Sequence, residues 1–173
     1  GAGEIGIATA RLAQAIQMQV KGMKRSTGTP PYFDSIGSED DLPELLADAD
    51  FVVNILPDPP STQHLMNHET FAYMKDGAYY INVGRGQTTD TRALLDALDS
   101  GKLAGAALDV FEEEPLPADH PLWRYPNVFI MPHVAGNDVD YNKKALRIFA
   151  ENLKAYLETG KPSRNVIDAK KGY

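Results

Sequence analysis

Short apolar runs alternate with helical segments along almost the whole chain, and this alternation constrains the fold more than any other feature. Strands are predicted at 20–23, 51–56, 78–83, 104–108 and 127–131, and helices at 7–18, 39–49, 67–74, 90–100 and 138–159. Ser38 and Asn67 are expected to cap two of these helices, and the Gly/Pro-rich segment 28–31 is expected to form a loop. Strands that are separated by helices pair in parallel, so the sequence predicts a doubly wound α/β fold with helices on both faces of a parallel sheet.

Composition excludes several classes of function. The 173 residues carry a formal net charge of -7, whereas a protein that binds phosphate backbones needs clustered cations, so no nucleic-acid partner is expected. No window approaches the ~20 continuous apolar residues that a membrane-spanning helix requires, so no membrane partner is expected. The chain contains no Cys, which removes thiolate chemistry and is typical of a reducing compartment. The expected location is the cytoplasm.

Polar residues follow the predicted strands. In doubly wound sheets, ligands bind beyond the carboxyl ends of the strands. The residues at these positions are Lys24-Arg25-Ser26, Pro57-Asp58, Gly84-Arg85-Gly86, Asp109 and His133. We therefore expect the functional site along this edge.

The pattern Gly1-x-Gly3-x-x-Gly6 opens the first predicted helix. Such glycines permit a tight turn and the close approach of a pyrophosphate to the N–H groups of a helix N-terminus, as in Rossmann-like dinucleotide sites. Alone the pattern is a weak signal, because any glycine-rich helix start shares it. The strand that normally precedes it is absent from the sequence, so we expect that an upstream segment is missing and that the sheet lacks its first strand.

Two cations and two hydroxyls occupy the place where an acidic residue normally selects NAD. In NAD sites an Asp or Glu about 20 residues beyond the glycines binds the ribose 2′-hydroxyl. Here the corresponding residues are Lys24, Arg25, Ser26 and Thr27, and the first later acid, Asp34, comes too late to end the strand. This favours NADP(H), with NAD(H) possible, because cations bind a 2′-phosphate. The alternative is that Lys24 and Arg25 are only solvated.

Arg85 and His133 are the candidates for chemistry. Arg85 lies between two glycines after a strand, and an arginine there can bind a carboxylate through two parallel hydrogen bonds. His133 also follows a strand, where an imidazole can donate a proton to a carbonyl oxygen. The alternatives are a surface arginine and a structural histidine. An acidic partner for His133 is expected in the run 112–114, and spacing alone does not choose among its three Glu residues.

Four ordered motifs together resemble the D-isomer-specific 2-hydroxyacid dehydrogenase family. They are residues 1–6, 82–86, 105–115 and 132–136. The resemblance implies an NAD(P)-dependent oxidoreductase in which Arg85 binds the substrate carboxylate and carbonyl, His133 is the acid/base and Glu114 is its partner. It also implies that Asp109 contacts the nicotinamide carboxamide. The predicted cofactor-binding residues are Gly1, Gly3, Glu4, Ile5, Gly6, Lys24, Arg25, Ser26, Leu56, Pro57, Thr62, Val83, Gly84, Arg85, Asp109, His133, Ala135 and Gly136.

Within this family, residues 121–124 and 170–173 are similar to the glyoxylate/hydroxypyruvate reductase branch, which commonly uses NADPH. The resemblance implies a homodimer that transfers hydride to a small 2-oxoacid such as glyoxylate or hydroxypyruvate. An alternative is a non-catalytic dinucleotide-sensing module, because co-repressors related to the family keep the same three residues. No metal is predicted, since His64 and His68 lack the Glu that a zinc-peptidase helix supplies.

Enzymes of this family have two domains, and the smaller substrate domain is built largely from residues before the glycine loop. We therefore interpret residues 1–160 as an N-terminally truncated dinucleotide-binding domain. Residues 161–173 would be a tail that returns to the absent substrate domain. Because half of the cleft walls would be missing, little or no turnover is expected from the isolated 173 residues.

Overall fold

The computed structural model describes residues 1–25, 28–57 and 60–166. The chain divides into two compact units, Gly1–Pro132 and His133–Tyr173. The first unit contains α1 (Glu4–Ala15), β1 (Lys21–Met23), β2 (Ser35–Gly37), α2 (Leu42–Leu46), β3 (Phe51–Asn54), η1 (Pro60–Thr62), α3 (His68–Tyr73), β4 (Ala78–Asn82), η2 (Gly86–Thr88), α4 (Thr91–Asp99), β5 (Leu103–Leu108), η3 (Pro121–Arg124) and β6 (Val128–Ile130). The second contains α5 (Tyr141–Thr159).

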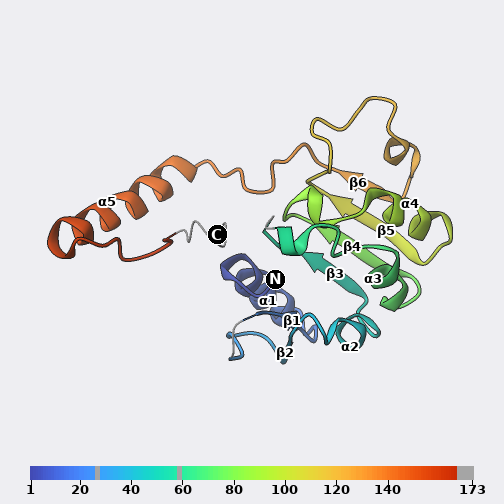
Figure 1. Ribbon diagram of the computed structural model, residues 1–173, viewed down its shortest axis with the longest axis horizontal. Helices are drawn as coiled ribbons and strands as arrows, with labels where there is room; N and C mark the ends of the chain where they lie inside the picture. Colours follow the sequence, from blue (N-terminus) through green and yellow to red (C-terminus); the bar gives the residue numbers. More distant parts are fainter. Residues whose placement is uncertain (26–27, 58–59, 167–173) are drawn as a thin grey trace. The chain divides into compact units, whose positions relative to one another are not determined.

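Four strands form a parallel sheet in the order β3-β4-β5-β6, and they lie side by side in Figure 1. Asn54 is in register with Asn82, Asn82 with Leu108, and Leu108 with Ile130. The carboxyl ends of all four strands therefore meet at one edge. The α/β fold that the alternation predicts is confirmed.

β1 and β2 form a separate parallel pair. The sequence did not predict β2, because Ser35–Gly37 contains a single apolar residue and only its pairing with β1 makes it a strand. Ala2 lies beside the end of this pair, since its N–H donates to the carbonyl oxygen of Met23 at 3.1 Å. Gly1 lies against the end of β3, where a Cβ would be 3.0 Å from the carbonyl oxygen of Ile55. Residues 1–2 thus lie between the carboxyl ends of β1 and β3.

The core of the first unit lies between one face of the four-stranded sheet and the helices α2, α3 and α4. Alternate residues along a strand face the same side, and Ala78 and Tyr80 of β4 are both buried on this face. The helices contribute Leu46, Phe71 and Leu94 to the same cluster. On the opposite face Phe51 and Tyr79 stack with ring centroids 5.6 Å apart and remain about half exposed.

Of the two helix caps predicted from the sequence, the structure confirms Asn67 and contradicts Ser38. Asn67 caps α3 as predicted, because its side chain accepts from the N–H groups of Glu69 and Thr70. Ser38 was wrong as a cap: α2 begins at Leu42, and Ser38 instead donates from N and Oγ to Asp41 Oδ2 at 2.7 and 2.9 Å. Pro43 explains the late start, since proline fits the first turn of a helix and disrupts its interior.

The second unit is dominated by α5. Gly160 ends the helix in the left-handed conformation at φ 75, the conformation that glycine adopts without strain. The apolar side chains of α5 include Leu146, Phe149, Leu153 and Leu157, and all four are exposed. Among the described helices, none combines the length and apolar content that a bilayer crossing requires.

Candidate active site at the carboxyl edge of the sheet

Glycines on both sides of Arg85 let three loops touch. A Cβ on Gly84 would lie 2.6 Å from the carbonyl oxygen of Leu56, after β3, and one on Gly86 would lie 1.8 Å from that of Phe111, after β5. No side chain fits at these distances, so only glycine permits the contacts. The Gly-Arg-Gly sequence is therefore a packing requirement of this edge.

Arg85 is exposed at the same edge. Its backbone is extended, with φ -136 and ψ 142, and its Nη1 donates to the carbonyl oxygen of Gly84 at 2.8 Å. No carboxylate in the described part of the chain forms an ion pair with the guanidinium. An exposed guanidinium without an acidic partner is suited to bind an anion from solution.

The N-terminus of α1 has the form of an anion site. Gly3 is the N-cap residue, and a Cβ there would meet nothing within 4 Å. A Cβ on Gly6 would lie 2.2 Å from the carbonyl oxygen of Gly1, so Gly6 lets the helix approach the loop. The exposed residues Glu4 and Ile5 form the first turn. Open space in front of unpaired helix N–H groups is where a phosphate binds.

Two cations follow β1. The half-buried Lys24 side chain forms no ion pair with any residue that the structure describes. Arg25 Nη2 donates to Ser61 Oγ at 2.8 Å and so links this loop to η1. Ser61 was not predicted as a site residue, and only its distance from Arg25 in the fold reveals it. Ser26 and Thr27 lie outside the described residues, as do Asp58 and residues 170–173.

The loop after β3 is held by internal hydrogen bonds. The N–H of Leu56 donates to Asn54 Oδ1 at 3.0 Å, and Thr62 Oγ1 donates to the carbonyl oxygen of Pro57 at 2.8 Å. The N–H of Val83 donates to the carbonyl oxygen of Asn54 at 3.1 Å. The structure therefore brings the predicted residues Leu56, Pro57 and Val83 to the edge that carries Arg85.

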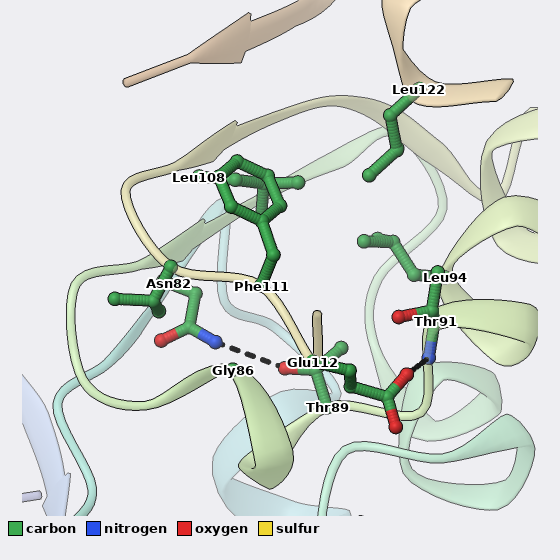
Figure 2. A pocket seen from close by; sticks show the side chains of 10 residues that line it. Asn82, Gly86, Thr89, Thr91, Leu94, Leu108, Phe111, Glu112 and Leu122 are labelled. Atoms are coloured by element: carbon green, nitrogen blue, oxygen red, sulfur yellow. Dashed lines mark hydrogen bonds between the residues drawn. The ribbon is translucent and has the colours of Figure 1, made fainter. Parts of the chain in front are cut away.

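The glutamates of the acidic run after β5 make different contacts, and Figure 2 shows the one between Glu112 and Thr91. Glu112 Oε1 pairs with His64 Nε2 at 2.5 Å, and its Oε2 accepts from the N–H of Thr91 at 2.7 Å. Glu114 Oε1 accepts from the N–H of Phe111 at 3.0 Å. Glu112 thus links the loop after β5 to His64 and to the start of α4.

Asp109 is buried at the end of β5, and its N–H donates to the carbonyl oxygen of Asn82 at 3.0 Å. Asp109 therefore lies beside the end of β4, and its contact with a nicotinamide carboxamide stays a prediction. Within the described residues, no cluster of three or more His, Asp or Glu side chains is arranged to hold a metal ion.

His133 belongs to the second unit together with Ala135 and Gly136, and all three are exposed. The backbone of His133 has φ 54, which lies in the left-handed region that few non-glycine residues adopt. Gln17, Tyr32, His64 and Asn165 also have a positive φ, so this conformation does not distinguish His133 as a site residue.

A buried polar network beneath the edge was not predicted from the sequence. A small cavity beside it is lined by Asn82, Gly86, Thr89, Leu108 and Phe111, and Figure 2 shows Asn82 donating to Thr89. The network also includes Asn54, Tyr80 and Thr88. The available signal was an asparagine at the end of two apolar strands, since asparagine is depleted in strands.

A parallel sheet with a glycine-opened helix and polar residues along its carboxyl edge defines a dinucleotide-binding α/β domain. Residues 1–135 match the model of the D-isomer specific 2-hydroxyacid dehydrogenase NAD binding domain. The chain belongs to this family.

Several relatives are similar over the full chain. Glyoxylate/hydroxypyruvate reductase A of Salmonella newport (strain SL254) is 36% identical over 173 residues, which are 100% of this chain and 54% of the relative. The crystal structure of a D-isomer specific 2-hydroxyacid dehydrogenase from Xanthobacter autotrophicus Py2 with NADPH and MES has 38% identity and a TM-score of 0.91, over 100% of this chain and 70% of that one. The NADPH-dependent glyoxylate/hydroxypyruvate reductase from Sinorhizobium meliloti, with NADP and sulfate, has 35% identity and a TM-score of 0.88, over 100% and 55%. The chain spans about half the length of the curated relatives that it matches.

Proposed function

We propose that this chain forms the cofactor-binding part of an NADPH-dependent reductase of small 2-oxoacids such as glyoxylate and hydroxypyruvate. The observation that carries the proposal is the exposed guanidinium of Arg85, which has no acidic partner among the described residues. The flanking glycines, Gly84 and Gly86, pack against the loops after β3 and β5 and so fix the backbone of Arg85 at the carboxyl edge. Relatives whose names include this activity, with NADP bound in one structure, support it.

The residues present fit a dinucleotide. The open space at Gly3 and the close approach at Gly6 suit a pyrophosphate at the N-terminus of α1. Lys24 and Arg25 would hold a 2′-phosphate, which makes NADP(H) the preferred cofactor and leaves NAD(H) as the weaker one. Ser61, which contacts Arg25, would help to orient that guanidinium.

The reaction divides among three side chains. Arg85 binds the substrate carboxylate and orients the carbonyl, because a guanidinium offers two parallel donors. His133 donates a proton to the carbonyl oxygen, and Glu114 is its acidic partner. When bound, NADPH would supply the hydride, and Asp109 would hold its nicotinamide carboxamide. The proposed protein is a homodimer located in the cytoplasm. The mass of the native particle in solution tests whether it is a dimer.

Turnover by the complete natural polypeptide tests the function. The absorbance of NADPH is followed with glyoxylate and with hydroxypyruvate for the wild type, Arg85→Gln and Arg92→Gln. Arg92 is a matched control, since it is an exposed arginine on α4 paired with Asp96. We expect Arg85→Gln to lower kcat/KM on the order of a hundredfold or more, as loss of a charge-assisted pair implies, and to change NADPH affinity little.

Two results would overturn the proposal. One is a wild type that binds NADPH and reduces no 2-oxoacid, which would favour the dinucleotide-sensing module. The other is an Arg85→Gln variant whose kinetics equal those of Arg92→Gln. The cofactor preference is tested separately, because Lys24→Gln should weaken binding of NADPH and leave that of NADH nearly unchanged.

A further inference from the structure

Two asparagines end neighbouring strands and hold the loops that follow. Asn54 is the last residue of β3 and Asn82 the last of β4, and the two are partners in register. Asn54 Oδ1 accepts from the N–H of Leu56 at 3.0 Å, and Asn82 Oδ1 accepts from the N–H of Gly84 at 2.9 Å. Each side chain thus fixes the residue two positions further along, as in an Asx turn.

The amide nitrogens of the same asparagines join one buried network. Asn54 Nδ2 donates to Tyr80 Oη and to Thr88 Oγ1, both at 2.8 Å. Asn82 Nδ2 donates to Thr89 Oγ1 at 3.1 Å, and that oxygen shares a hydrogen bond of 2.6 Å with Tyr80 Oη. The five residues are between 0% and 5% exposed. Removing one of these side chains would therefore leave buried polar groups of its neighbours incompletely hydrogen-bonded, which is costly.

Three donors converge on the carbonyl oxygen of Arg85. Thr88 donates to it from Oγ1 at 2.6 Å and from its N–H at 3.2 Å, and Asn82 Nδ2 donates to it at 3.3 Å. The exposed guanidinium of Arg85 therefore belongs to a residue whose backbone is hydrogen-bonded to the buried network. The same network binds the N–H of Leu56 through Asn54, so it holds the loops after both β3 and β4.

We propose that Asn54, Asn82 and Thr88 are positioning residues that set the place of Arg85 relative to the loop after β3, which contains Leu56. The inference rests on the proposed function of Arg85. A fully satisfied buried network favours one arrangement of its members. Because a misplacement of about 1 Å can cost on the order of a hundredfold in rate, such an anchor has a direct kinetic effect. None of the three needs to touch the substrate.

Paired variants of Thr88 test the proposal in the complete natural enzyme. Thr88→Val keeps the shape and removes the hydroxyl, whereas Thr88→Ser keeps the hydroxyl. Thr70→Val is the matched control, because Thr70 is 7% exposed and donates to the carbonyl oxygen of Leu65 at 2.8 Å, within the cap of α3. All variants are compared for melting temperature, kcat and KM with glyoxylate, and NADPH affinity.

We expect Thr88→Val to lower kcat/KM at least about tenfold, mainly through KM for the 2-oxoacid, with NADPH affinity changed less than about twofold. Thr88→Ser should restore most of the loss. Thr70→Val should lower the melting temperature and leave the kinetics near those of the wild type. A loss in Thr88→Val that Thr88→Ser does not restore, or an equal loss in Thr70→Val, would show a general packing effect and overturn the proposal.

Hydrogen exchange on the chain itself separates this inference from the proposed function. The amides of residues 84–89 should exchange at least about tenfold faster in Thr88→Val than in the wild type, and at the wild-type rate in Thr70→Val. If the wild type reduces no 2-oxoacid, the proposed function fails, and the exchange still decides whether the network holds the loop of Arg85. Unchanged exchange in Thr88→Val would refute the anchor whatever the activity.

Discussion

Replacing Gly86 by Ala tests whether the loops after β4 and β5 are in direct backbone contact. The added Cβ would lie 1.8 Å from the carbonyl oxygen of Phe111, so the two backbones must separate by more than an ångström. That movement breaks the bond from Gln87 Nε2 to the carbonyl oxygen of Glu112 and strains the bond from the Thr91 N–H to Glu112 Oε2. Overpacking costs about 1–3 kcal/mol and the lost hydrogen bond about 1 kcal/mol, so we expect a loss of about 2–4 kcal/mol.

Thermal unfolding measures this loss. For a chain of this size each kcal/mol corresponds to about 2–4 °C, so Gly86→Ala should lower Tm by about 10 °C. Gly84→Ala should have a smaller effect, because its Cβ would lie 2.6 Å from the carbonyl oxygen of Leu56. Gly3→Ala is the control, since its Cβ meets nothing within 4 Å. Equal melting temperatures for Gly86→Ala and Gly3→Ala would refute the contact between the loops.

Two further predictions concern stability. Burial raises the pKa of Tyr80 to about 12 from 10.0, so the folded chain favours the neutral phenol. This stabilisation is complete below pH 10 and is lost as the pH rises through 12, by up to about 3 kcal/mol. Urea unfolding at rising pH should show this loss in the wild type and in Tyr79→Phe, whose ring is exposed, and a smaller loss in Tyr80→Phe. Asp90 accepts from the N–H groups of Arg92 and Ala93 at the start of α4, so Asp90→Ala should lower the free energy of unfolding by about 1 kcal/mol and Asp90→Asn by less. A pH profile of Tyr80→Phe equal to that of the wild type, or an Asp90→Ala as stable as the wild type, would contradict them.

The elements that could be predicted from the sequence are those whose signals are local. The strands β3 to β6 are apolar runs between turn residues, and α3 and α5 carry a capping Asn67 and a closing Gly160. The start of α2 was misplaced because Ser38 has the residue type of a cap, whereas Pro43 decides where the helix begins. The strand β2 was missed because its pairing with β1 is tertiary and its own residues carry no β pattern.

The candidate site likewise contains residues that a local sequence motif indicates and contacts that depend on the tertiary structure. Arg85 and the glycines around it were found as a motif, but the motif does not say why glycine is required. The reason lies in the carbonyl oxygens of Leu56 and Phe111, which come from other parts of the chain. The contact of His64 with Glu112 likewise depends on two loops that meet only in the fold. The functions assigned to Arg85, His133 and Glu114 stay predictions.

The two strand-ending asparagines connect the stability of the edge with its proposed chemistry. A buried carboxamide costs free energy unless its bonds are satisfied, so Asn54 and Asn82 stabilise the chain only when the loops lie where their bonds form. Apolar residues in the same positions would pack without specifying where Gly84 and Leu56 lie, because dispersion contacts tolerate small shifts that hydrogen bonds do not. The polar network therefore fixes the backbone position of an irregular loop as closely as a strand's hydrogen bonds fix a strand. A guanidinium needs such a fixed position if it is to bind a small carboxylate in one orientation.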